Sequence, residues 1–107
     1  MVVYGKEAPL QTLDEKSRRK ILSHAGSLMM VEVQFDKGGE GAAHRHVHEQ
    51  ITYVAEGQFR FTIEGEEFTV QKGDSLYFPS NALHGCVCLE SGKVIDIFNP
   101  QREDFLK

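Results

Sequence analysis

Short runs of alternating apolar and polar residues, separated by glycine-containing turns, dominate residues 28–99 of the sequence. In residues 58–63, for example, Phe59, Phe61 and Ile63 alternate with polar residues, and a glycine turn follows. A period of two places one side of each run in a core and the other in solvent, as in a half-buried β-strand. Glycine supplies the backbone conformations that tight turns between such strands need. The pattern predicts an all-β sandwich or barrel.

A chain of 107 residues supports one compact domain with one core. Residues 1–27 show no clear period, and we expect them to form an N-terminal arm or short strand. Residues 28–107 are expected to form the β-barrel domain, including the C-terminal tail. Within the arm, residues 18–22 fit either the end of a helix or a short strand.

The charge of the chain limits its partners. It carries 16 acidic residues against 12 Lys and Arg, for a formal net charge of −4, and its bases are scattered. This argues against a protein that binds nucleic acid or an anionic membrane. No apolar run approaches the ~18 residues that a membrane helix needs, and the first residues lack the apolar core of a signal peptide. We therefore expect a cytoplasmic protein with neither nucleic acid nor membrane as a partner.

The two cysteines, Cys86 and Cys88, are separated by one residue. In a strand they point to the same side, and so short a loop makes an unstrained disulfide difficult. We expect reduced thiols, as in a reducing cytosol. Packing in the core is favoured over metal ligation by the Cys-x-Cys pair.

Histidines are the strongest functional signal. His44, His46 and His48 alternate after a glycine-rich stretch, and His84 follows a proline turn. On an extended segment, His-x-His places both imidazoles on one side, within reach of a single cation. A solvated polar loop that binds metal only adventitiously is the alternative. His48 is either a hydrogen-bond partner or proton shuttle beside the site, or a residue packed at the loop surface.

The residues around these histidines resemble the first motif of the cupins, a family of small β-barrels. That motif reads Gly, five residues, His-x-His, three or four residues, Glu, six residues, Gly. In this chain it runs from Gly38 through His44 and His46 to Gly57, with Gln50 at the Glu position.

The second cupin motif, Gly, five residues, Pro-x-Gly-x-x-His, then Asn four residues further on, is matched from Gly73 through Pro79 to His84. Asn81 replaces the Gly, a mild change because Asn also tolerates the left-handed backbone conformation. Cys88 replaces the trailing Asn, so any role of that Asn is absent here. The resemblance implies a single-domain jelly-roll β-barrel.

The resemblance also implies one divalent transition metal ion, bound by His44, His46, Gln50 and His84. Nickel, iron, manganese, cobalt and zinc all suit such a donor set. Three neutral imidazoles and a neutral amide leave the ion its full double charge, which strengthens it as a Lewis acid and attracts an anionic substrate. Gln50 therefore favours acid–base over redox chemistry.

The C-terminal segment carries a second signal. In a strand, Asp96 and Phe98 share one face. Asp96 then lies either on an exposed edge strand or in a polar cavity, and composition alone favours the edge. The pattern Asp-x-Phe-x-Pro-x-Arg-x-Asp-Phe, residues 96–105, resembles the KdgF-type cupins of pectin and alginate breakdown. That resemblance implies Asp96 and Arg102 as the catalytic pair, with Phe98 and Arg102 contacting the substrate.

The resulting hypothesis is an isomerase-like, metal-dependent ring opening of 4,5-unsaturated monouronates, small anionic sugar acids, to linear keto forms. Pectin-derived and alginate-derived substrates differ only in stereochemistry, and the sequence does not choose between them. A non-catalytic sugar- or metabolite-binding cupin and a cupin dioxygenase are the alternatives. The resemblance to small cupins implies a homodimer, and we also expect one because Ile95 and Ile97 would point outward and need cover if Asp96 faces the cavity.

Overall fold

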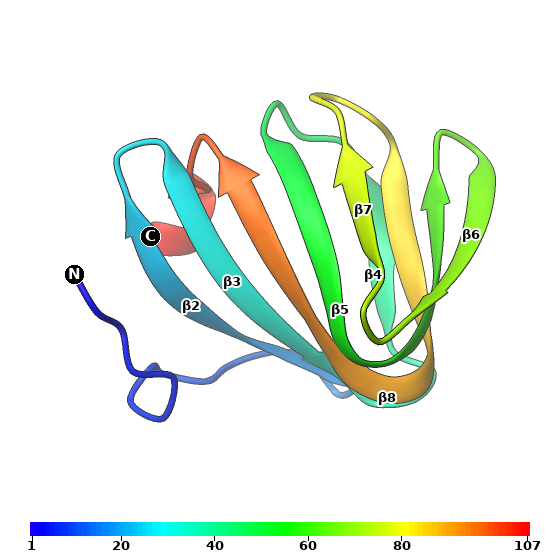
Figure 1. Ribbon diagram of the computed structural model, residues 1–107, viewed down its shortest axis with the longest axis horizontal. Helices are drawn as coiled ribbons and strands as arrows, with labels where there is room; N and C mark the ends of the chain where they lie inside the picture. Colours follow the sequence, from blue (N-terminus) through cyan, green and yellow to red (C-terminus); the bar gives the residue numbers. More distant parts are fainter.

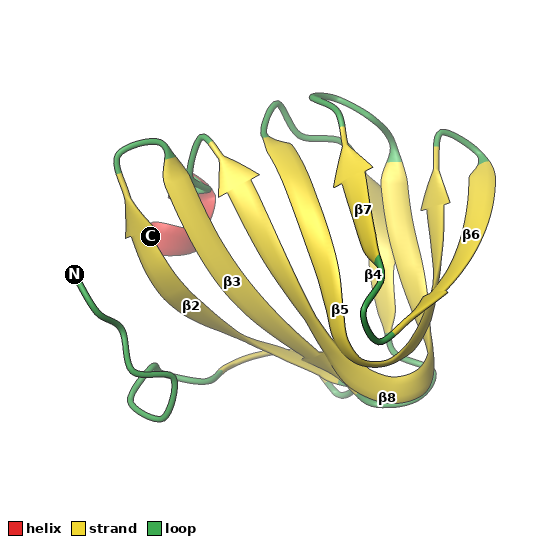
Figure 2. Cartoon of the chain, viewed as in Figure 1, coloured by secondary structure: helices red, strands yellow, loops and turns green.

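The computed structural model describes residues 1–107, nearly all of whose regular structure is β-strand. The strands, in chain order, are β1 (Gln11–Asp14), β2 (Ser17–Ala25), β3 (Leu28–Phe35), β4 (Glu40–His44), β5 (Glu49–Ile63), β6 (Glu66–Gln71), β7 (Ser75–Phe78) and β8 (His84–Asn99). A single 3-10 turn, η1 (Glu103–Leu106), closes the chain. The all-β prediction is confirmed (Figure 2).

The strands form one sheet with the order β1-β2-β3-β8-β5-β6, while β4 pairs with β8 and β7 with β5. All pairings are antiparallel. The first half of β5 pairs with β7 and with the second half of β8, which also pairs with β3. The second half of β5 pairs with β6 and with the first half of β8, which also pairs with β4. Two layers therefore share two long strands.

These two long strands bend together near their middles, and the sheet folds onto itself there (Figure 1). Register shifts interrupt the β5–β8 pairing between Val54 and Phe59, as expected where a bulge turns a strand. Gly92 lies at this bend, and a Cβ on it would clash with the carbonyl oxygen of Glu56. Only glycine permits so close an approach of the two strands.

The core fills the space between the two layers. Phe59 and Val54 are fully buried, and Phe35 packs edge-on against Phe59 with ring centroids 5.5 Å apart. The alternating pattern of the sequence is the reason, since every second side chain of each strand points between the layers. The buried cluster comprises Met29, Val31, Val33, Phe35, Val54, Phe59, Phe61, Phe78, Cys88, Val94 and Phe98.

The N-terminal region joins the same sheet. Residues 18–22, for which the sequence left helix and strand open, belong to β2, which pairs with β3 from Ser17 to Ala25. The division of the chain at residue 28 stays a prediction. No helix in the structure has the length and apolar character needed to cross a membrane.

Candidate active site

Three histidine side chains meet at the end of the molecule away from the β5–β8 bend. His44 ends β4, His84 begins β8 directly opposite it, and His46 lies in the loop that follows β4. Their ligand-type nitrogens all lie within 4.8 Å of one another. His84 is buried, whereas His44 is exposed. The structure thus brings together three of the predicted metal ligands.

The backbone fixes which nitrogen of each ring is free. In every ring Nδ1 faces a carbonyl oxygen two residues away, at 2.8 Å (His44 to Ala42), 3.0 Å (His46 to His48) and 2.9 Å (His84 to Ala82). A carbonyl only accepts, so Nδ1 of each ring carries a hydrogen, and Nε2 is the nitrogen whose lone pair can bind a cation. The Nε2 of His84 is accordingly buried without a hydrogen-bond partner. Three lone pairs are left for one cation.

Gln50 completes this cluster. Its Oε1 lies 3.1 Å from Nε2 of His46. Desolvation, helped by the charges of Arg102 and His84, lowers the pKa of His46 to about 4, so its ring is neutral and has one N–H. That one hydrogen serves only one of the two oxygens that His46 faces. With that hydrogen on Nδ1, Nε2 of His46 and Oε1 of Gln50 face each other as two acceptors. A cation bound by both atoms would remove the repulsion between them. The residues present fit a divalent transition metal.

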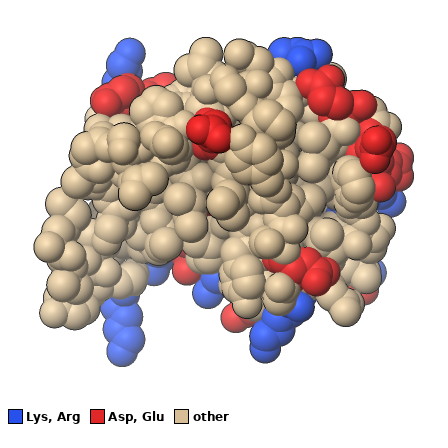
Figure 3. Space-filling view, turned by 45° about the horizontal axis from the view of Figure 1, so that its top comes forward, with Lys and Arg blue, Asp and Glu red and all other residues tan.

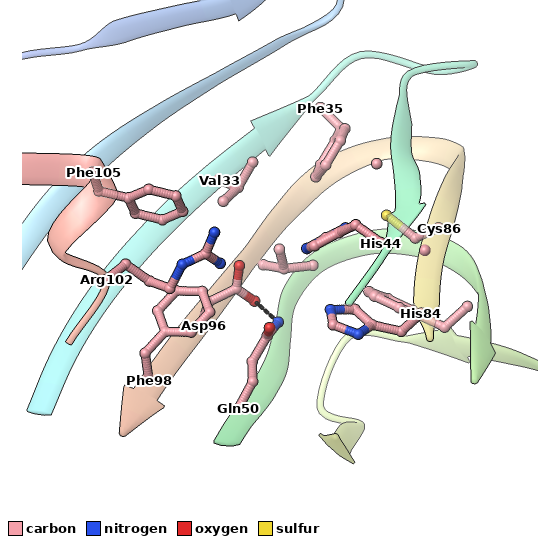
Figure 4. Close-up of a pocket in the computed structure, with 14 residues that line it drawn as sticks. Val33, Phe35, His44, Gln50, His84, Cys86, Asp96, Phe98, Arg102 and Phe105 are labelled. Carbon is pink, nitrogen blue, oxygen red and sulfur yellow. Dashed lines mark hydrogen bonds between the residues drawn. The ribbon is translucent and has the colours of Figure 1, made fainter. Parts of the chain in front are cut away.

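Asp96 lies next to this cluster on the inner face of β8. Its Oδ1 accepts a hydrogen bond from Nε2 of Gln50 at 3.2 Å (Figure 4). The same oxygen accepts a second one from the Thr52 hydroxyl at 2.6 Å. Desolvation raises the pKa of Asp96 to about 6, against the opposing effects of these hydrogen bonds and of the Arg102 charge. The edge-strand interpretation is wrong, because β8 pairs with β3 and β5 on its two sides at this residue.

Arg102 reaches the pocket from the segment between β8 and η1. Its Nε and Nη2 lie 3.1 and 2.9 Å from the carboxylate of Asp104. The guanidinium carbon stands 4.3 Å from the centre of the Phe105 ring and 5.2 Å from that of Phe98. The guanidinium of Arg102, which we expected to contact the substrate, is therefore paired here with the side chain of Asp104.

Phe105 lines the pocket, and sequence reasoning did not single it out as a site residue. Its ring lies against two guanidinium groups, that of Arg102 and that of Arg19 on β2, whose carbon is 3.8 Å from the ring centre. Its ring also meets Phe98 edge-on, with centroids 5.7 Å apart. Phe105 is the last residue of the Asp-x-Phe-x-Pro-x-Arg-x-Asp-Phe pattern, so the sequence contained a signal for it. Its contact with Arg19, which is far away in the sequence, becomes visible only in the fold.

One pocket collects most of these groups (Figure 4). Its polar wall is formed by His44, Gln50, His84, Asp96 and Arg102. Its apolar wall is formed by Val33, Phe35, Phe61, Val94, Phe98 and Phe105. A carboxylate, a guanidinium, an amide and two of the imidazoles thus line one small space.

His48 and the cysteines lie around this site in different ways. The backbone carbonyl of His48 accepts a hydrogen bond from Nδ1 of His46, and the two rings lie side by side with centroids 5.4 Å apart. Both cysteines are free. Cys88 is in the core, while Cys86 lines the pocket as a neutral thiol, because burial raises its pKa to about 12.

A folded antiparallel sheet with a three-histidine cluster at its open end is the architecture of the cupins, and the chain belongs to the cupin family: the model of the cupin domain matches residues 31–98. The chain is 46% identical over 102 residues to the pectin degradation protein KdgF of Dickeya dadantii (strain 3937), covering 94% of this chain and 93% of that protein.

Two solved structures are also similar to this chain. KdgF from Halomonas sp. is 38% identical, with a TM-score of 0.94 over 98% of this chain and 97% of that one. An RmlC-like cupin from Shewanella frigidimarina NCIMB 400 is 38% identical, with a TM-score of 0.94 over 97% and 94% of the two chains. The resemblance seen in the sequence is confirmed.

Proposed function

We propose that this protein catalyses the metal-dependent ring opening of 4,5-unsaturated monouronates from pectin or alginate to linear keto-uronates. The observation that carries the proposal is the shared pocket, which Asp96 and Arg102 line together with His44, Gln50 and His84. The 46% identity to a pectin degradation protein supports this substrate class. The two free cysteines suit a reducing cytoplasm, where we place the reaction.

In this proposal His44, His46, Gln50 and His84 hold one divalent transition metal ion. When bound, the ion would stabilise negative charge that develops on substrate oxygens and would attract the anionic substrate. Its identity among nickel, iron, manganese, cobalt and zinc would follow availability, because all accept nitrogen and oxygen donors.

The chemistry that the side chains must serve is an isomerisation. The substrate is a cyclic enol ether with a hemiacetal at C1 and a carboxylate at C5. Loss of the C1 hydroxyl proton forms the C1 carbonyl and breaks the bond from C1 to the ring oxygen. The electron pair stays on that oxygen as an enolate, and a proton added at C4 turns it into the C5 ketone. No atom is gained or lost.

Asp96 is the group that we assign to the proton transfers. Its pKa of about 6 leaves it ionised at neutral pH, so it can accept a proton from the substrate. This pKa is also close enough to pH 7 for the protonated group to give the proton up again. Arg102 would bind the substrate carboxylate, either through its remaining donors or by exchanging Asp104 for the substrate. Phe98 would form the apolar wall beside the ring.

The test is the ultraviolet absorbance of the enol ether on incubation with unsaturated galacturonate and with its alginate counterpart. We expect the band to disappear with metal-loaded protein and to persist with protein stripped by a chelator. Elemental analysis should give about one metal ion per chain, since three histidines and one amide supply a single donor set. Oxygen uptake would support a dioxygenase instead, and binding without turnover would support a sugar-sensing module.

We further propose that the protein is a homodimer. Four apolar side chains stand side by side on the outer surface of one layer, in the cross-strand order Met30, Ile97, Ile51 and Tyr77. Three of them are 37% (Met30), 47% (Ile51) and 52% (Tyr77) exposed. The strands that carry this apolar row face the viewer in Figure 1. In the tilted view of Figure 3, most charged side chains lie along the rim, and only isolated acidic ones interrupt the uncharged surface inside it. Such a surface needs a partner.

A further inference from the structure

The buried hydroxyl of Thr52 is not used by the proposed chemistry, and its position suggests another task. We infer that Thr52 is a positioning residue: together with Asp96 it fixes the side-chain amide of Gln50 so that the amide oxygen faces the histidine cluster. This inference rests on the proposed function, because it concerns how that metal site is kept in order.

The sheet register brings the three groups together. Gln50 and Thr52 are two residues apart on β5, so both side chains point inward. Asp96 stands directly opposite Thr52 on β8. Thr52 is fully buried and Gln50 is 6% exposed, so water does not compete for their hydrogen bonds. The sheet therefore holds a closed triangle of polar groups.

The hydrogen-bond inventory of this triangle allows one arrangement. The Thr52 hydroxyl gives its single hydrogen to Asp96 at 2.6 Å, so towards Gln50 it only accepts. The Asp96 oxygen that Gln50 faces is the one that accepts this hydrogen from Thr52, so it is also an acceptor. Gln50 must therefore present its nitrogen to both, at 2.9 Å (Thr52) and 3.2 Å (Asp96). A flipped amide would set an oxygen against two acceptors.

The same constraint decides what faces the metal site. With the nitrogen of Gln50 committed to Thr52 and Asp96, its oxygen is the atom 3.1 Å from His46 Nε2. An amide oxygen is a metal ligand, whereas an amide NH₂ has no lone pair to offer. A glutamate at this position would bring a carboxylate oxygen against Asp96, which accounts for the amide where the first cupin motif carries Glu.

The test removes the hydroxyl and measures metal binding without any substrate. Zinc affinity is determined by competition with a chelator for wild type, Thr52→Val and Thr52→Ser. We expect about a tenfold loss for Thr52→Val, the usual scale for an outer partner of a metal ligand. Thr52→Ser keeps the hydroxyl and should bind zinc like the wild type. Thr69→Val is the matched control, because Thr69 is exposed on β6.

A spectroscopic signal separates positioning from general weakening. In the cobalt-loaded protein, we expect Thr52→Val to change the visible ligand-field bands and Thr52→Ser to restore them, since the amide oxygen is one donor of the set. If Thr52→Val does not fold, Thr52→Ala removes the same hydroxyl with less bulk. Wild-type affinity and spectra in a folded variant without the hydroxyl would overturn this inference alone. A wild type that binds no metal would instead overturn the proposed function.

Discussion

Asp96 carries an ionisable carboxyl group on a central strand, where the sheet gives it two hydrogen-bond donors and little water. Asp96→Asn keeps the shape of the side chain and an oxygen that accepts from Thr52 and Gln50. Metal content should therefore stay the same. Turnover of unsaturated galacturonate should fall by about a hundredfold or more, the usual scale for losing a positioned acid–base group. Turnover near the wild-type rate would contradict the role assigned to Asp96.

The raised pKa of Asp96 also makes the stability of the folded protein depend on pH. The folded protein binds this proton up to about pH 6, while the unfolded chain releases it near the ordinary value of 3.8. Stability therefore falls as pH rises from about 4 to 6, by an amount on the order of 3 kcal/mol. The metal-free Asp96→Asn variant has no ionisable group at this position, so it does not lose this stability as the pH rises.

Urea unfolding of the two metal-free proteins checks this difference. At pH 8 the variant should have the larger free energy of unfolding, because only the wild type buries an ionised carboxylate there. At pH 4 the difference should shrink, since the folded wild type is then protonated. A variant that is equally or less stable at both values would show that burial of Asp96 costs nothing.

At the scale of elements, the 3-10 turn η1 at the C-terminus links the pocket to the N-terminal strand β2. Phe105 of η1 contacts Arg102 at the pocket and Arg19 on β2. Phe105→Ala removes the surface on which Arg102 rests. We expect KM for the uronate to rise about fivefold, equivalent to about 1 kcal/mol of lost cation–π contact, while kcat changes less because Asp96 is untouched.

Phe105→Tyr serves as the control for this element, because it keeps an aromatic face for both guanidinium groups. Its KM should remain close to that of the wild type. An equal loss in both variants would point to a general disturbance of η1, and unchanged kinetics in Phe105→Ala would show that Arg102 holds its place without the turn.

For the whole molecule, the parts of the fold that are local in sequence could be predicted and those that depend on distant contacts could not. Alternation and glycine turns predicted the strands, and motif spacing predicted that His44, His46 and His84 would meet. Thr52 gave no signal, because its role exists only through the β5–β8 register. Composition misjudged Asp96, since no local pattern shows that a strand has neighbours on both sides.

The last prediction concerns the assembly. If the apolar row on the outer surface joins two copies, light scattering should give twice the 12.1-kDa chain mass at micromolar concentration. Ile51→Glu places a charge in the row at a site that is 47% exposed, so it should produce a folded monomer. Phe68→Glu is the control, because Phe68 is 41% exposed on β6, in the other layer. Since a charge buried without a partner in an apolar interface is costly, only the first variant should dissociate. A wild-type protein that is monomeric at this concentration would contradict the proposal that the apolar row joins two copies.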